Sequence, residues 1–283
     1  MTPLIFFLLT FLASSAAGLL GALLGLGGGI IIVPFLTLVM GVDIHYAIGA
    51  SIVSVIATSS GAAAAYLRDH ITNIRIGMFL EMATTLGAIS GAFFAAILAG
   101  PWLFLLFAAI LAYSAVSMLR RPTRTMGNVS VPHDRLADAL QLNGSYYDAA
   151  LGRVVEYRAS GGLLGLILMY VAGAVSGLLG IGSGVLKVPA MDIAMYLPMK
   201  VSTATSNFMI GVTAAASAGV YFSRGQINPF IAAPVALGVL LGATVGTRLM
   251  TRTKSVLLRR IFVVVMLAVA AQMLWRGLTM LGV

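Results

Sequence analysis

A single lysine and two glycine-rich clusters are the residues of this chain best suited to chemistry. Lys187 follows the cluster Gly180-Ile181-Gly182-Ser183-Gly184, and a similar cluster, Gly25-Leu26-Gly27-Gly28-Gly29, lies near the N-terminus. Glycine lets a backbone turn sharply and approach a ligand closely. A short helix that begins after such a break presents free N–H groups and a positive dipole end, which favour a small anion. The alternatives are that the glycines only allow close helix packing and that Lys187 extends to a polar interface.

Polar side chains at the start of the helix that follows each cluster could complete such a site. Ser51 leads the first of these helices, and Ser206 and Asn207 lead the second. Their hydroxyl and amide groups can bind the oxygens of an oxyanion, or they can hydrogen-bond to a neighbouring helix. The candidate substrate-binding residues are Gly27, Gly28, Gly29, Ser51, Gly182, Ser183, Gly184, Lys187, Ser206 and Asn207.

Four further ionisable residues lie at or near apolar segments, namely Asp43, His45, Glu81 and Asp192. Carboxylates and histidines relay protons in pumps, so each could serve in coupling. Each also lies near an expected helix end, and we interpret them as interfacial residues. The chain has no cysteine, its three histidines fall in separate loops, and no HExxH or GxSxG motif occurs. We therefore expect no enzymatic activity, no cofactor and no metal site.

The composition indicates that these residues are held in a membrane. The chain has 283 residues, of which 60% are hydrophobic and 9% charged, and its mean hydropathy is +1.04. A soluble domain is nearer half apolar and a quarter charged, so a soluble enzyme, a disordered chain and a nucleic-acid binder are excluded. A spanning helix needs roughly 20 apolar residues, which leaves room for about eight to ten spans. The net charge of +9 then reports basic cytoplasmic loops.

The same pattern occurs twice, at a constant offset of 155 residues. Each glycine cluster leads to a Val-Pro pair, Val33-Pro34 in the first copy and Val188-Pro189 in the second, and Tyr66 falls on Tyr221. A gapless register of this kind indicates a duplication. The organisation we predict is a first membrane repeat at residues 1–119, a connector at 120–159 and a second membrane repeat at 160–283.

Each repeat is expected to hold a helix, a glycine break, a short apolar helix and three spanning helices. The first copy places these helices at 3–24, 30–40, 45–67, 76–99 and 102–119, and the second at 160–179, 185–195, 200–222, 229–249 and 256–281. The short helices have about 11 residues, or roughly 16 Å, which is too short to cross a bilayer unaided. In the polar connector, the Asn143-Gly144 turn and the run Val154-Val155-Glu156-Tyr157 indicate a small cap or hairpin.

The distribution of basic residues distinguishes two possible topologies. If each break is only a kink, the repeats are parallel, and the two sides of the membrane carry ten and six basic residues. If the chain turns back at the glycines, the repeats are inverted and the sides carry fourteen and two, with Lys187 counted on neither. The second distribution obeys the positive-inside rule. We therefore predict an all-α polytopic membrane protein of two inverted repeats, each with a glycine-broken helix hairpin plus three spanning helices. The connector would be cytoplasmic and both termini outside, and whether the hairpins fully cross or are re-entrant stays open.

The paired clusters and the run Ala204-Thr205-Ser206-Asn207-Phe208 resemble the TauE/SafE family. These are bacterial and archaeal membrane proteins linked to the export of sulfite and organosulfonates, and the resemblance spans nearly the whole chain. Ser183 departs from the family's GxGGG pattern, and Ala50-Ser51-Ile52 stands in copy one where copy two has Thr205-Ser206-Asn207. The resemblance implies a transporter, and these departures leave the identity of its ligand open.

Repeats with breaks at matching positions predict a transporter that works by alternating access at a site between its halves. We expect a prokaryotic inner (plasma) membrane protein that exports a small anion such as sulfite or an organosulfonate, with an anion channel as the alternative. The expected partners are the anionic substrate, the lipid bilayer and a coupling proton or ion, and nucleic acid is excluded. The anion, the direction of transport and self-association into a homo-oligomer stay open.

Overall fold

The fold is known from a computed structural model that describes residues 2–24, 27–68, 70–119, 132–148, 152–250 and 255–282. Gly25 and Leu26 of the first glycine cluster lie outside the described residues, as do 120–131 of the predicted connector. The first half contains α1 (Pro3–Leu24), α2 (Gly29–Pro34), the π-helix η1 (Phe35–Val39), α3 (Ile44–Arg68), α4 (Ile74–Ala95) and α5 (Gly100–Leu119). The connector holds α6 (Arg135–Ala139), β1 (Gly144–Asp148) and β2 (Arg153–Tyr157), and the second half holds α7 (Gly162–Leu179), α8 (Gly184–Ala194), α9 (Met199–Ser223), α10 (Pro229–Met250) and α11 (Ser255–Leu281).

Both glycine clusters interrupt the helices where the sequence predicts a break. Gly27 and Gly28 have φ values of +80° and +72°, and Gly180 and Gly182 have +64° and +69°. Residues with a Cβ rarely adopt this left-handed region, so glycine suits both the turn before α2 and the end of α7. The short helices α2 and α8 start directly after these turns.

Five helices within the described residues are both long and apolar enough to cross a bilayer. These spans are Pro3–Leu23, Ile44–Arg68, Ile74–Ala95, Gly162–Leu179 and Pro229–Leu249. The helix α9 is longer than several of them, with 25 residues, yet is less apolar because it carries a run of buried hydroxyl and amide side chains. Those polar groups face protein, not lipid, which is the arrangement that a membrane interior demands.

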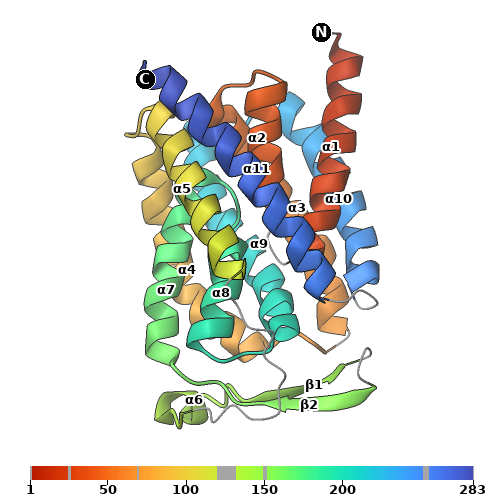
Figure 1. The fold of residues 1–283 in the computed structure, drawn as a ribbon, viewed down its shortest axis with the longest axis vertical. Coiled ribbons are helices and arrows are strands. Elements are labelled where there is room, and N and C mark those ends of the chain that lie inside the picture. Colours follow the sequence, from red (N-terminus) through yellow and green to blue (C-terminus); the bar gives the residue numbers. More distant parts are fainter. Residues whose placement is uncertain are drawn as a thin grey trace.

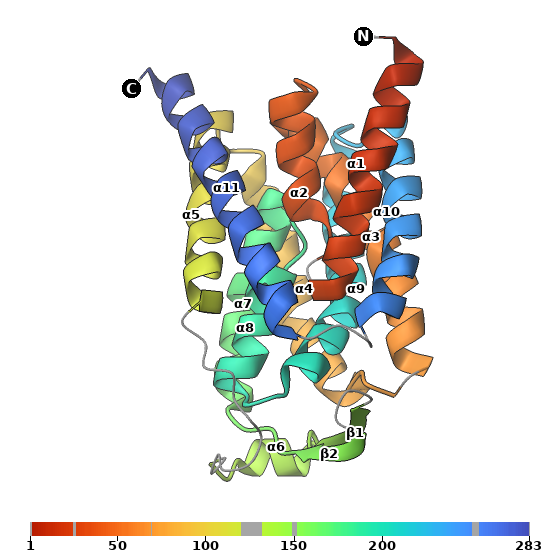
Figure 2. The same cartoon turned by 45° about the vertical axis from the view of Figure 1, so that its right-hand side comes forward.

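The two ends of the chain lie at one end of the bundle and the connector at the other (Figures 1 and 2). The helix α1 begins at the end of the bundle that also holds the C-terminus, whereas its counterpart α7 begins beside α6 and the β1–β2 hairpin (Figure 1). Equivalent helices of the two halves therefore start from opposite ends of the molecule.

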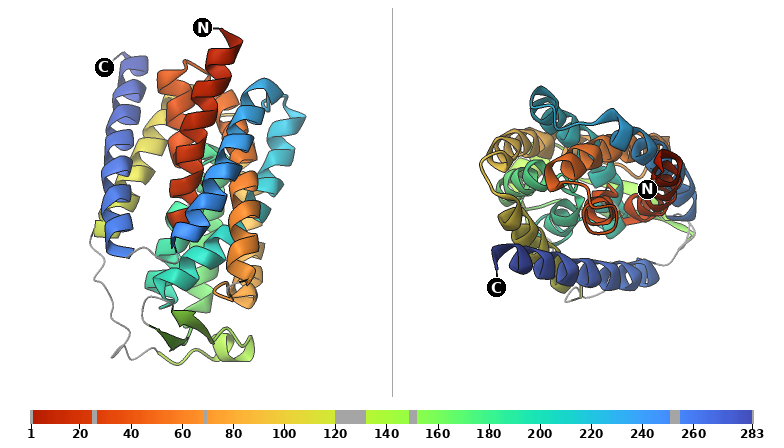
Figure 3. Two further views of the ribbon diagram at one scale, coloured as in Figure 1. Left: turned by 90° about the vertical axis from the view of Figure 1, so that its right-hand side faces the viewer. Right: turned by 90° about the horizontal axis from the view of Figure 1, so that it is seen from above.

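Helices of the two halves pack against one another throughout the bundle. The helix α1 lies along α10 (Figure 3), and α4 lies along α7. The backbone at Gly87 meets the carbonyl of Tyr170 so closely that no Cβ would fit, and Gly242 meets the carbonyl of Ser15 in the same way. The two contacts are equivalent under the repeat. The offset of 155 residues relates Gly87 to Gly242 and Ser15 to Tyr170. Contacts exchanged in this manner are the signature of a two-fold relation between equivalent parts.

Contacts within each copy are also repeated. The Tyr66 hydroxyl donates to the carbonyl of Ala22 at 3.0 Å, and the Tyr221 hydroxyl donates to the carbonyl of Gly177 at 2.9 Å. Both tyrosines are fully buried. Each satisfies a carbonyl in the last turn of a broken helix, where intrahelical partners are lacking.

The connector contains a small antiparallel sheet, so the prediction of an all-α protein was incomplete. Gly144 pairs with Tyr157 and Asp148 pairs with Arg153, which gives the hairpin that the run 154–157 predicted. The interpretation of Asn143-Gly144 as the turn was wrong, because Gly144 is the first residue of β1. The Asn143 side chain instead accepts a hydrogen bond from the Ala159 N–H, which closes the open end of the hairpin.

Polar contacts fasten the hairpin to the bundle. The Asn73 side-chain amide donates to the carbonyl of Leu142 and to the Tyr157 hydroxyl, both at 3.0 Å. The Lys200 ammonium pairs with the Asp148 carboxylate at 2.8 Å. Because Asn73 caps α4 and Lys200 lies in the first turn of α9, the hairpin holds the starts of both helices together.

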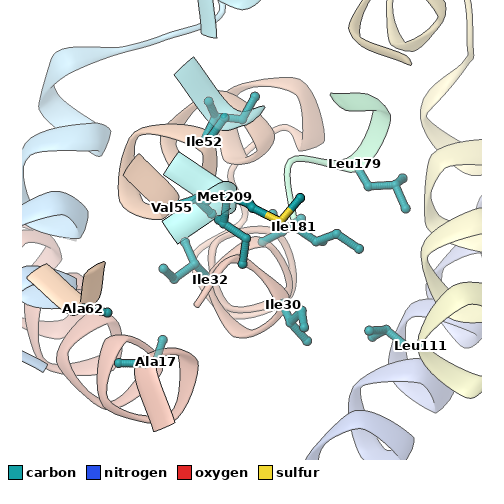
Figure 4. Close-up of a cluster of buried hydrophobic side chains, with 14 of the residues drawn as sticks. Ala17, Ile30, Ile32, Ile52, Val55, Ala62, Leu111, Leu179, Ile181 and Met209 are labelled. Atoms are coloured by element: carbon teal, nitrogen blue, oxygen red, sulfur yellow. The ribbon is translucent and has the colours of Figure 1, made fainter. Parts of the chain in front are cut away.

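The centre of the bundle is apolar around the breaks. The side chains of Ile32, Val55, Ile181 and Met209 belong to one buried cluster (Figure 4), contributed by α2, α3, the second break and α9. Gly27 adjoins this cluster, because a Cβ there would lie 3.2 Å from methyl groups of Val55 and Ile210.

Candidate functional site

The two glycine breaks meet inside the bundle. The Ser51 hydroxyl of α3 donates to the carbonyl of Gly180, in the second break, at 2.6 Å. A Cβ at Gly29 would lie 2.5 Å from the Ser51 Oγ and 2.7 Å from the Gly180 oxygen. Glycine is therefore required at this position for close approach, and Ser51 and Gly29 of the first half join the second break.

Lys187, in the first turns of α8, is completely buried and belongs to a polar network. Its Nζ donates to the Thr213 Oγ1 at 2.6 Å and pairs with the Glu81 Oε2 at 3.3 Å. The Thr213 hydroxyl donates to the Glu81 Oε1 at 2.6 Å. Three elements, α4, α8 and α9, thus contribute one member each. The alternative in which Lys187 extends to an interface is wrong, because its side chain has no exposed surface.

Glu81 is held by two more hydroxyl groups. The Thr84 Oγ1 donates to Oε2 at 2.9 Å, and the Thr85 Oγ1 donates to Oε1 at 3.1 Å. The glutamate is 8% exposed. Our interpretation of Glu81 as an interfacial residue was wrong, because its carboxylate points into the bundle toward Lys187. Buried charges of this kind are stable only when paired and hydrogen-bonded.

Two groups near the start of α8 have unused hydrogen-bonding capacity. An ammonium group carries three protons, and only Glu81 and Thr213 accept from Lys187 among the residues that the structure describes. The Ser183 hydroxyl is buried and has no partner within the same described ranges. Ser183 is the N-cap of α8 and lies four residues before Lys187, so both side chains lie on one face of the helix. The first N–H groups of α8, starting at Gly184, lie at the same end.

The network joins the two halves, and its counterpart under the repeat carries no charge. Glu81 comes from the first half, and Lys187 and Thr213 come from the second. The offset of 155 places Ala236 opposite Glu81, Ile32 opposite Lys187 and Thr58 opposite Thr213. The repeat therefore supplies a second, equivalent position that has a threonine and no charged residue.

The remaining candidates lie closer to the first break. The Asn207 side-chain amide donates to the carbonyl of Ala22 at 3.2 Å, and the Asn207 carbonyl accepts from the Ser59 hydroxyl. Ser206 is fully buried beside it. Gly28 is the N-cap of α2, and its carbonyl accepts from the N–H groups of Ile31 and Ile32. The Asn207 side chain thus joins α9 to the last turn of α1. This contact is separate from the hydrogen bonds of the Lys187 network.

Two other ionisable candidates, Asp43 and Asp192, are exposed or partly exposed. Asp43 is exposed and pairs with His45 at 3.2 Å, in agreement with an interfacial position. Asp192 is partly exposed near the end of α8. Within the described residues, no three histidine, aspartate or glutamate side chains are grouped so as to hold a metal ion.

Sequence reasoning missed Thr84 and the pairing of Glu81 with Lys187. A signal for the pairing was available, because both residues are charged where the other copy has an apolar residue. Two such departures inside apolar segments, in a sequence that otherwise repeats, are best explained when the two charges meet.

Comparison with known proteins gives one family and several relatives. The family described as sulfite exporter TauE/SafE matches residues 10–273. A probable membrane transporter protein, YunE of Bacillus subtilis (strain 168), is 27% identical over 274 residues, which cover 93% of this chain and 95% of that protein. A probable membrane transporter protein of Xylella fastidiosa (strain 9a5c) is 29% identical over 268 residues, which cover 93% of this chain and 94% of that protein. No solved structure matches.

Proposed function

The chain belongs to the sulfite exporter TauE/SafE family of membrane transporters, and on this premise we propose that it exports a small oxyanion such as sulfite or an organosulfonate. The substrate would bind at the start of α8, where Lys187 supplies the positive charge. The Ser183 hydroxyl and the first N–H groups of α8 would donate to the anion's oxygens.

The observation that carries this proposal is the unused donor capacity of Lys187 and Ser183 at one helix end. A buried hydroxyl without a partner is costly, and so is an intramembrane charge. Both costs are offset when an oxyanion accepts from both groups. A cation or an apolar substrate would leave these donors unsatisfied.

Alternating access between inverted repeats is the transport mechanism that we propose. Support comes from the exchanged contacts of Gly87 and Gly242, and from the start of α1 and α7 at opposite ends of the bundle. Two breaks that meet at Ser51 and Gly180 give a centre about which the halves could rock. The interface at this centre is made of glycine, serine and aliphatic groups, which can slide with little loss of polar contacts.

We propose that the hairpin end of the bundle faces the cytoplasm of a prokaryotic cell. Arg68, Arg75 and Lys200 lie at helix ends on that side, whereas Arg224 and Arg276 lie toward the termini. Positively charged loops are retained in the cytoplasm. A reporter fused after residue 283 and active only in the cytoplasm should therefore stay inactive.

Anion binding is testable by thermal stabilisation of the purified protein in detergent. A ligand that binds only the folded state raises the melting temperature, so sulfite, sulfate or methanesulfonate should do so and choline should not. The Lys187→Ala variant should lose this response and Lys187→Arg should keep part of it. Lys200→Ala is the matched control, because Lys200 also pairs with a carboxylate but lies at the hairpin. If Lys187→Ala responded as the unaltered protein does, the binding role of Lys187 would be refuted.

Counterflow in liposomes separates a transporter from the channel alternative. Vesicles loaded with unlabelled anion should transiently accumulate labelled anion against its gradient, because an alternating carrier exchanges one molecule for another. A channel lets both species run down their gradients and cannot produce this overshoot. Flux that rises without saturation and shows no overshoot would assign the protein to the channel class.

A further inference from the structure

We propose that Glu81 is the proton-coupling residue of this transporter, taking up one proton whenever a monovalent anion binds at Lys187. The inference rests on the proposed function. It adds the identity of the coupling ion and the residue that carries it.

The argument begins with the charge of the buried network. Lys187 and Glu81 together are neutral, and the pair is enclosed by α4, α8 and α9. An anion that joined this pair would leave one uncompensated negative charge in a site with little water. Such a charge is expensive at membrane depth. A proton on Glu81 restores neutrality, because the anion then replaces the carboxylate as the partner of the ammonium group.

The geometry allows this exchange without breaking the scaffold. The Glu81 oxygens accept from Thr84, Thr85 and Thr213, so a carboxylic acid at this position keeps hydrogen-bond partners after it releases Lys187. The contact between Lys187 and Glu81 is the longest of the network, at 3.3 Å. Its loss frees a second ammonium proton for the anion. The proton and the anion would then cross as one neutral unit, in the direction set by their combined gradients.

Six other titratable groups lie on the helices that surround the pair. The elements packed around Glu81 and Lys187 are α4, α5, α7, α8 and α9, and within the described residues their other titratable side chains are Arg75, Tyr113, Tyr170, Asp192, Lys200 and Tyr221. Arg75 bonds to Gln141, and Lys200 bonds to Asp148, both in the connector. None of the six forms a described hydrogen bond or ion pair with Glu81 or Lys187.

The position that the repeat makes equivalent indicates that this network serves function rather than folding. The counterparts of Glu81, Thr84, Thr85 and Lys187 are Ala236, Val239, Leu240 and Ile32, all apolar. The fold therefore forms at the equivalent position without any charge. A buried ion pair is seldom more stabilising than apolar residues of similar volume, so its presence at only one of the two equivalent positions calls for a role in transport.

Proton uptake on anion binding tests the proposal. Purified protein in weakly buffered detergent solution is mixed with methanesulfonate, whose charge does not change with pH, and a pH indicator reports protons taken up. The unaltered protein should take up about one proton per anion bound, and its affinity should rise up to about tenfold per unit fall in pH. Glu81→Gln should bind the anion with no proton uptake and no pH dependence, and should bind more tightly than the unaltered protein at alkaline pH.

Two further variants keep the test decisive if Glu81→Gln does not fold. The double variant Glu81→Ala, Lys187→Ile carries the residue types of the counterpart positions, Ala236 and Ile32, and is expected to fold. It should show no proton uptake when methanesulfonate is added. The control Lys200→Ala should keep full uptake. Anion binding without proton uptake in the unaltered protein, or uptake that persists in either Glu81 variant, would overturn the role of Glu81. Absence of binding by the unaltered protein would overturn the proposed function and this inference with it.

Discussion

Replacing Gly246 by alanine should separate α1 from α10. A Cβ at Gly246 would lie 2.6 Å from the backbone oxygen of Leu19, where contact would require more than 3 Å. The helices must move apart by about half an ångström or more, and such a gap forfeits a quarter or more of each nearby dispersion contact. Overpacking of this kind costs about 1–3 kcal/mol. Alanine also favours a helix over glycine by about 1 kcal/mol, which opposes the clash.

The control Gly219→Ala isolates the clash from the helix preference. Gly219 lies inside α9, and nothing lies within 4 Å of its added Cβ. Its alanine variant should be neutral or slightly more stable than the unaltered protein. The Gly246→Ala variant should melt below the Gly219→Ala variant by about 2–12 °C, at about 2–4 °C per kcal/mol. Gly91→Ala should be more damaging still, because Gly91 approaches the Ala174 carbonyl more closely.

The assay is the fraction of protein that remains monodisperse on size-exclusion chromatography after heating in detergent. Heating rate and detergent must be held constant, because unfolding of such proteins is often irreversible. If the Gly246 and Gly219 variants had the same melting temperature, close backbone packing of α1 and α10 would not hold the halves together.

The remaining predictions concern the joint between the breaks and the connector. Ser51→Ala removes the donor to the Gly180 carbonyl and leaves that buried oxygen unsatisfied, so it should cost about 1–3 kcal/mol, measured as a lower melting temperature. A Ser51→Ala protein with unchanged melting would contradict the contact. The hydrogen bond from the Gly162 N–H lowers the pKa of Asp134 below its ordinary value of 3.8. The attachment of α6 to α7 should therefore hold above that value and weaken as the pH falls below it. Hydrogen exchange at the Gly162 amide, corrected for its intrinsic rate at each pH, should show this loss, whereas Asp134→Asn should show none.

The positions of the helices could be predicted from the sequence because lipid imposes simple rules. Expected helices at 3–24 and 160–179 correspond closely to α1 and α7, since long apolar runs ended by glycine leave few alternatives. The π-helix η1 was not anticipated, because it depends on how the chain recovers from Pro34. Proline offers no N–H to the preceding turn, and the Met40 N–H reaches back five residues to the Phe35 carbonyl.

Individual residues of the site could be predicted from the sequence, but the contacts between them could not. Lys187 and the glycine breaks are conspicuous in the sequence, because charge and repeated glycine are rare in apolar segments. Glu81 lies 106 residues from Lys187 in the sequence. Its closeness to an expected helix end suggested an interfacial position. Only the packing of α4 against α7 and α9 brings its carboxylate to the ammonium group. Hydropathy reports how deep a residue lies and not which helix faces it.

The packing of α1 against α10 and of α4 against α7 has a consequence for biogenesis. During synthesis α1 and α4 enter the bilayer long before α10 and α7, the helices against which their backbones pack. Until then, the close-packing faces at Gly18 and Gly87 are in contact with lipid or with an insertase. A ribosome that stalls in the connector therefore leaves a fragment that cannot complete its own packing, and quality-control proteases should remove it. Two separately made halves should still assemble when co-expressed, because each carries the surfaces that the other lacks.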